Sequence, residues 1–255
     1  MKILCLGDIV GRRAVEYLSK ILWKKRVELD VDFVIANGEN ASDIHGISSD
    51  EAESLLSAGV DFITTGNHVF KCRDIYPYLD ANPEKIIRPC NFPGSCPGYG
   101  YSIADVCGYK ALIINAQGQA FMDTLDSPFD AVELALERES GNYDFSILDF
   151  HAEATSEKYA VARVFDGKIN IIFGTHTHVP TADVQILPNG TGYVTDLGMC
   201  GPVNGILGTD TKAVLRKMRD RMPARFVPAD GEIQAQGVIF EISDGKILSA
   251  QRIAF

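Results

Sequence analysis

The sequence contains only six cysteines in 255 residues, and no two of them form a Cys-x-x-Cys pair. This pattern excludes a disulfide framework and a zinc site built from paired thiolates. Scattered thiols are typical of reducing compartments, so the sequence predicts a cytoplasmic protein. The cysteines are Cys5, Cys72, Cys90, Cys96, Cys107 and Cys200.

Long apolar runs are also missing. No window approaches the roughly 18 consecutive apolar residues that a membrane-spanning helix needs. The apolar start of the chain reaches Gly7-Asp8 before the roughly 7–15 apolar residues of a signal peptide are complete. The sequence therefore predicts a soluble protein that does not enter a membrane.

Positive charge is scarce, because 24 Lys and Arg stand against 34 Asp and Glu, for a formal net charge of −10. This sign disfavours binding to long nucleic acid. It would also repel a small phosphorylated substrate unless metal ions or a few basic residues supply local positive charge. The 46% hydrophobic and 23% charged residues are ordinary for a globular protein and exclude a disordered, collagen-like or coiled-coil chain.

Short apolar runs alternate with amphipathic stretches, which is typical of β-α-β units. Helices are expected over 51–58, capped by Ser48 or Ser49, and over 128–139, with a hairpin over 101–115 around Gly108. No linker or internal repeat interrupts the chain. We therefore predict an α/β fold in one domain, 1–255, with two packed sheets flanked by helices. The apolar runs read as strands are 3–6, 33–36, 62–65, 145–150, 169–173, 184–187, 192–195 and 237–254.

Polar residues follow many of these strands, at the end where open α/β sheets present ligands. Carboxylates, amides and imidazoles without thiolates favour iron, manganese or magnesium over a structural zinc, although zinc stays compatible. Eight such groups are too many for one catalytic ion with open positions, and they suit two ions bridged by a carboxylate. The candidates are Asp8, Glu39, Asn40, Asn67, His68, His151, His176 and His178.

Taken one at a time, most of these residues have a structural explanation. Asp8 could cap a helix, Asn67-His68 could form a turn, and His151 could be a hydrogen-bonded core residue. The pair of His176 and His178 is more specific, because alternation along an extended segment turns both imidazoles to one side. A metal site is therefore indicated by the whole set of residues rather than by any one member.

Five motifs match a known pattern. The chain resembles, from end to end, the YmdB-like family of calcineurin-type metallophosphoesterases, bacterial enzymes acting on cyclic nucleotides. It has Val10 where the wider superfamily usually has a histidine, and the family pattern offers Asn40 instead. The motifs are Gly7-Asp8-Ile9-Val10-Gly11, Asn37-Gly38-Glu39-Asn40, Gly66-Asn67-His68, the segment from Asp149 to Lys158, and the segment from Gly174 to Pro180.

The resemblance implies a four-layer αββα sandwich of the metallophosphoesterase type, with two mixed sheets flanked by helices. It also implies two divalent or trivalent metal ions, with iron as the leading candidate. Glu39 would bridge the ions, and His68 would remain off the metals as a general acid. The first ion would take Asp8, Glu39, Asn40 and His178, and the second Glu39, Asn67, His151 and His176.

The activity that the resemblance implies is hydrolysis of a small-molecule cyclic nucleotide by in-line attack of a metal-bridging hydroxide. A 2′,3′-cyclic nucleotide is the preferred substrate and a 3′,5′-cyclic nucleotide a weaker one. The alternatives are a phosphomonoesterase and a metal-containing regulatory protein that binds a cyclic nucleotide or an RNA-processing partner. The family also makes a homo-oligomer an expectation. His45 departs from the family pattern, and we expect it to be a surface loop residue.

Overall fold

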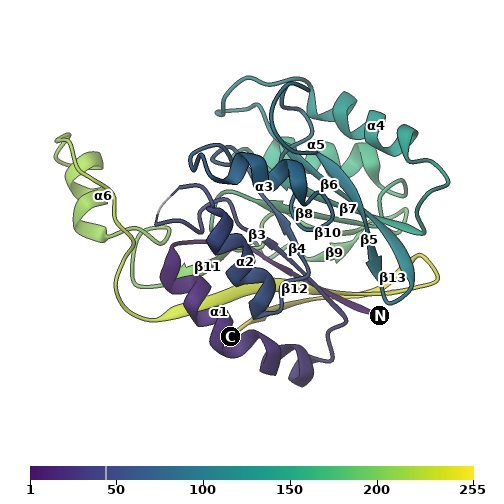
Figure 1. The fold of residues 1–255 in the computed structure, drawn as a ribbon, viewed down its shortest axis with the longest axis horizontal. Helices are drawn as coiled ribbons and strands as arrows, with labels where there is room; N and C mark the ends of the chain where they lie inside the picture. Colours follow the sequence, from purple (N-terminus) through teal and green to yellow (C-terminus); the bar gives the residue numbers. More distant parts are fainter. Residues whose placement is uncertain (44) are drawn as a thin grey trace.

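The computed structural model describes residues 1–43 and 45–255. Within them the chain forms a seven-stranded and a six-stranded mixed sheet that pack face to face, with helices on both outer faces (Figure 1). This arrangement confirms the predicted αββα sandwich. In the described chain no helix is both long and apolar enough to span a bilayer.

The first sheet has the strand order β2-β11-β12-β1-β3-β4, with β13 paired to β12. Its parallel strands β1, β3 and β4 run in the same direction, so their carboxyl ends meet at one edge. The strands are β1 (Lys2–Leu6), β2 (Asp8–Ile9), β3 (Phe33–Asn37), β4 (Phe62–Thr64), β11 (Met199–Pro202), β12 (Ile233–Ser243) and β13 (Lys246–Ala254).

The second sheet has the order β5-β6-β7-β8-β10-β9. Strands β6, β7, β8 and β10 are parallel, while β5 and β6 form the predicted hairpin around Gly108. The strands are β5 (Tyr101–Val106), β6 (Tyr109–Gln117), β7 (Phe145–His151), β8 (Ile171–Thr175), β9 (Gln185–Ile186) and β10 (Gly192–Val194).

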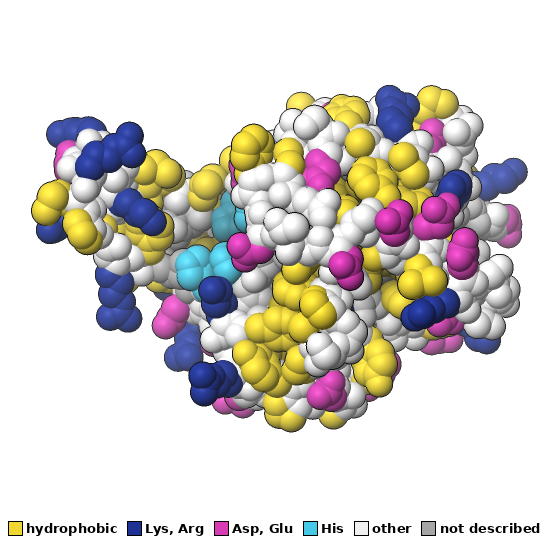
Figure 2. All heavy atoms as spheres, turned by 90° about the horizontal axis from the view of Figure 1, so that it is seen from above, with side chains coloured by type: hydrophobic (Ala, Val, Ile, Leu, Met, Phe, Trp, Pro, Cys, Tyr) yellow, Lys and Arg dark blue, Asp and Glu magenta, His cyan; other side chains and the backbone are white. Residues whose placement is uncertain are grey.

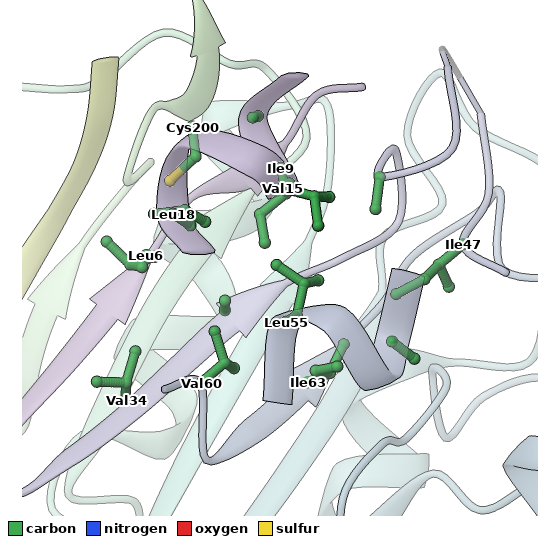
Figure 3. Packing of buried hydrophobic residues seen from close by; sticks show 14 of the residues in the cluster. Leu6, Ile9, Val15, Leu18, Val34, Ile47, Leu55, Val60, Ile63 and Cys200 are labelled. Atoms are coloured by element: carbon green, nitrogen blue, oxygen red, sulfur yellow. The ribbon is translucent and has the colours of Figure 1, made fainter. Parts of the chain in front are cut away.

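Alternation along the strands builds three apolar layers. In β1, Ile3 and Cys5 face the second sheet, whereas Leu4 and Leu6 face the outer helices, because successive side chains of a strand point to opposite faces. Figure 3 shows Val15 and Leu55, from two helices, gathered with Val34 of the sheet in the outer layer. Each sheet therefore packs against apolar side chains on both of its faces.

Helices α1 (Arg12–Leu29), α2 (Ser49–Ala58) and α3 (Ile75–Ala81) pack on the first sheet, and α4 (Pro128–Arg138) and α5 (Thr155–Phe165) on the second. Helix α2 follows Ser48, where the predicted cap forms a capping box with Glu51. A sixth helix, α6 (Thr211–Met218), lies on an extension that stands clear of the sandwich (Figure 1). The sequence pattern did not predict α3, α5 or α6.

Candidate metal centre

All eight candidate residues meet at one edge of the sandwich. The first sheet supplies Asp8 in β2 and the residues that follow β3 and β4, and the second supplies residues at the ends of β7 and β8. The carboxyl ends of parallel strands therefore bring together side chains that are up to 170 positions apart in the chain. The segments are Glu39-Asn40, Asn67-His68, His151 and His176 to His178.

One cluster of donor atoms surrounds Nε2 of His151. Asn67 Oδ1 lies 2.9 Å from this nitrogen, Glu39 Oε2 lies 3.1 Å away, and His176 Nδ1 lies 3.1 Å away. Ligands about 2.1 Å from one ion are roughly 3.0–3.5 Å apart. The donors are thus gathered at the separations that a metal ion imposes, and Glu39, His151 and His176 can hold one together.

A second cluster lies beside the first and involves Asp8, Asn40 and His178. His178 Nε2 is 3.9 Å from Asp8 Oδ1 and 3.3 Å from the amide nitrogen of Asn40. Asn40 also donates to Glu39 Oε1 at 2.8 Å, so the two carboxylate oxygens of Glu39 point to different clusters. This position suits Glu39 for a bridging role.

The hydrogen bonds of Asp8 show whether the residues of the site fit a cation. Its Oδ2 accepts a hydrogen bond from the His176 backbone N–H at 3.0 Å, whereas its buried Oδ1 has no hydrogen-bond partner within residues 1–43 and 45–255. A buried carboxylate oxygen without a partner is costly. A cation held by Asp8 and His178 would remove that cost, so the donor set fits a metal ion.

Asn40 is turned away from this role. Its amide nitrogen faces Glu39 and His178, and its oxygen lies 3.0 Å from Nδ1 of His68. Because only the oxygen can ligate a cation, ligation by Asn40 would require a half-turn of the amide.

The electrostatics of the site favour positive charge at its centre. Burial alone would raise the pKa of Glu39, but the imidazoles of His151 and His68 outweigh it and hold that pKa well below its ordinary value. Burial likewise opposes the charged form of His151, yet the carboxylates of Glu39 and Asp8 raise its pKa to about 9. Burial and the neighbouring His151 instead lower the pKa of His176 to about 3. The carboxylates of Glu39 and Asp8 therefore create a negative potential that a bound metal ion would neutralise.

Gly66 lets the loop after β4 approach the centre. A Cβ atom at this position would collide with the ring of His151 and with Oε2 of Glu39. The missing side chain therefore allows Asn67 to reach its donor position.

A hydrogen-bonded chain beneath the site orients His151. Its Nδ1 lies 2.8 Å from the hydroxyl of Thr175, which donates to Asp149 Oδ1 at 2.7 Å. Because its own proton goes to Asp149, the hydroxyl can only act as an acceptor toward the ring, so the Nδ1 proton is fixed and Nε2 faces the donor cluster. Asp149 is itself held by Asn37 and Thr64. The sequence pattern assigned Asp149 and Thr175 no role, although a lone carboxylate in an apolar strand is a detectable feature.

His68 lies at the outer side of the two donor clusters, and its side chain is partly exposed. Its Nδ1 is 3.0 Å from Asn40 Oδ1 and 3.3 Å from Glu39 Oε1, and its backbone N–H donates to Glu39. His45 is exposed, as expected, but its ring lies against that of His68, with 4.1 Å between the ring centroids. His45, which departs from the family pattern, therefore contacts a residue of the candidate site.

A buried ion pair holds the loop that carries His176 and His178. Lys158 of α5 donates to the carbonyl of Thr175 at 2.8 Å and to Asp196 at 2.7 Å. The same carboxylate oxygen accepts from the backbone N–H and the hydroxyl of Thr177. Sequence reasoning missed this pair, because its members are far apart and α5 was not predicted.

Replacing Lys158 with methionine should lower the free energy of unfolding by about 3–5 kcal/mol, because Asp196 would remain buried without its counter-charge. Chemical denaturation measures the loss. Lys168→Met is the matched control, since Lys168 forms an exposed ion pair with Glu133, and it should cost at most about 1 kcal/mol. Equal stability of the two variants would contradict the anchoring role of Lys158.

Comparison with known proteins identifies the chain's relatives. The sequence model of the YmdB-like protein family matches residues 4–253. The 2′,3′-cyclic-nucleotide 2′-phosphodiesterase of Bacillus subtilis (strain 168) is 38% identical over 244 residues, which cover 96% of this chain and 92% of that protein. The chain belongs to the YmdB-like family.

Solved structures agree with this assignment. A hypothetical protein from Thermus thermophilus has a TM-score of 0.94 and 35% identity, covering 100% of this chain and 99% of the other. A novel phosphatase from Mycoplasma pneumoniae has a TM-score of 0.93 and 32% identity, covering 100% of this chain and 93% of the other. This YmdB-like chain is therefore a phosphoesterase with the metallophosphoesterase fold, and Glu39, His151 and His176 form a possible metal site in it.

Proposed function

We propose that the chain is a dinuclear metal-dependent phosphodiesterase that hydrolyses 2′,3′-cyclic nucleotides, with 3′,5′-cyclic nucleotides as weaker substrates. The observation that carries the proposal is the position of Glu39, whose Oε2 belongs to one donor cluster and whose Oε1 borders the other. The named activity of the Bacillus subtilis relative supports the choice of substrate.

The two clusters define which residues would hold the ions. Asp8, Asn40 and His178 would join Glu39 at the first ion, and Asn67, His151 and His176 would join it at the second. When bound, the ions supply positive charge for the phosphodiester oxygens and lower the pKa of water. The mixed oxygen and nitrogen donors favour iron, with manganese or magnesium as alternatives and zinc still compatible.

His68 would supply the proton that the leaving ribose oxygen needs. Ligation by Asn40 would take a half-turn that brings its oxygen toward the first cluster. In the protonated ring of His68, Nδ1–H can then donate to Glu39 Oε1, 3.3 Å away, and the proton on Nε2 is the one that reaches the ribose oxygen.

The reaction balances without a redox partner. Water supplies the oxygen that bonds to phosphorus, His68 gives its proton to the ribose oxygen, and a proton released by the attacking water restores His68. One P–O bond of the ring breaks, and the product is a phosphate monoester.

A substrate panel tests the proposal. Enzyme of measured metal content should hydrolyse 2′,3′-cyclic nucleotides with a higher kcat/KM than 3′,5′-cyclic nucleotides, and both faster than phosphate monoesters. The competing function is that of a phosphomonoesterase. The Mycoplasma pneumoniae phosphatase of the same fold supports this alternative. Faster turnover of monoesters would replace our proposal with that function.

A further inference from the structure

An arm of the chain, defined here as residues 203–232, leaves the first sheet after β11 and returns to it at β12. Helix α6 forms its far end and stands away from the sandwich (Figure 1). The base of the arm is held by pairing of Thr209 with Ile206 and Pro228 and by a 2.9 Å bond from Asp210 N to Val227 O. The arm is therefore an ordered extension whose helix is built outside the sandwich.

The charge of the arm is opposite to that of the whole chain. Residues 203–232 hold six of the 24 Lys and Arg and four of the 34 Asp and Glu, and the outer part, 212–225, holds all six cations with Asp220 as its one acidic residue. Asp220 pairs with Arg219 at 3.2 Å, and across the described residues the other five cations form no ion pair. These five are Lys212, Arg216, Lys217, Arg221 and Arg225. A basic segment on an acidic protein is suited to bind a polyanion.

The arm begins beside the candidate metal centre. The carbonyl oxygen of Leu207 lies 3.1 Å from Nδ1 of His178, which belongs to the first donor cluster. Figure 2 shows histidine side chains between the body and the arm, with Lys and Arg side chains over the arm. A phosphate chain that ends at the site could therefore continue along the cations of α6.

We propose that the arm binds the phosphate backbone of a single-stranded oligoribonucleotide whose terminal 2′,3′-cyclic phosphate enters the site. The proposal rests on the proposed function and names its substrate class as an RNA end rather than a free nucleotide. Such ends form when a 2′-hydroxyl of RNA attacks the adjacent phosphodiester and expels the 5′-oxygen of the next nucleotide as a 5′-hydroxyl, so a reaction of that class would supply the substrate. The eight residues of α6 span about 12 Å, enough for a few phosphates. This reach agrees with a net charge that disfavours long nucleic acid.

The test compares two substrates that share the same terminal ring: a 2′,3′-cyclic mononucleotide and an oligoribonucleotide of about ten residues. The arm variant replaces Lys212, Arg216, Arg221 and Arg225 with serine. The control variant replaces the exposed residues Lys20, Lys24, Lys110 and Lys168 with serine, which changes the net charge by the same amount.

Wild type and control should prefer the oligonucleotide, and raising the salt from about 50 to about 200 mM should lower kcat/KM for it by about 50-fold if four phosphates are contacted. The arm variant should lose this salt dependence and the preference, while its metal content and its turnover of the mononucleotide stay at wild-type values.

Three outcomes would overturn the arm's role: no preference for the oligonucleotide in wild type, equal losses in arm and control variants, or equal losses on both substrates. Exposed Leu215, Met218 and Met222 give the arm an apolar surface, so sedimentation is measured as well. A changed mass of the arm variant with the oligonucleotide preference retained would assign the arm to contact with a second copy. Turnover of neither cyclic substrate by wild type would instead overturn the proposed function, and the arm proposal with it.

Discussion

Glu39→Ala should empty both metal sites and abolish phosphodiesterase activity. Wild-type protein should carry close to two metal ions per chain, because each donor cluster is completed by one carboxylate oxygen of Glu39. Alanine removes both oxygens at once, whereas the loss of any other ligand would weaken one cluster first. Elemental analysis of the purified variant, alongside the turnover of a 2′,3′-cyclic nucleotide, measures the effect.

Two further variants make the result specific. Glu133→Ala removes an exposed carboxylate on α4 and should keep wild-type loading. Asn67→Ala should lose at most one ion, since Asn67 contacts only the cluster around His151. Full loading of Glu39→Ala would show that Glu39 is not the bridge, and loss of a single ion would assign it to one cluster.

The layers of the fold could be predicted because they depend on local patterns. Ile3, Leu4, Cys5 and Leu6 read as one buried strand, and their alternation between two apolar layers follows from strand geometry. The same reasoning located the hairpin around Gly108 and placed the cap at Ser48 or Ser49, of which Ser48 forms it. These features need no information from distant parts of the chain.

Helix α6 could not be predicted in the same way. Val214 is its only buried residue in the described structure, so no apolar stripe marks the helix in the sequence. Its basic composition was present in the sequence, but the net charge of the whole chain masked it. A count of charge along short segments would have separated residues 212–225 from the acidic remainder.

The sequence indicated which residues gather at the candidate site, but not the residues that hold them in place. Polar residues after parallel strands must lie at one edge, so Asp8, Glu39 and His151 could be grouped from the sequence. The partners of Lys158 could not, because Asp196 lies 38 positions further along the chain. A lysine in an amphipathic segment reads as exposed until the tertiary structure supplies a buried counter-charge.

His68→Ala should lower the turnover of a 2′,3′-cyclic nucleotide by about 10²–10⁴-fold while the metal content stays near that of wild type. The structure places His68 outside the donor cluster around His151, with its Nδ1 toward Asn40 and Glu39. His176→Ala is the comparison, since it removes a donor 3.1 Å from His151 Nε2 and should lose metal. Equal metal loss in both variants would make His68 a ligand.

Substrates with different leaving groups distinguish whether His68 acts as a general acid or only shapes the site. Opening the 2′,3′-cyclic phosphate expels a ribose alkoxide, which needs a proton as the P–O bond breaks. A nitrophenyl diester releases a stabilised phenolate that departs without one, so His68→Ala should impair this substrate far less. The measurement is the ratio of the two losses in kcat/KM, taken at matched metal content. Because a disturbed metal site would slow both substrates alike, equal losses would remove His68 as the proton donor.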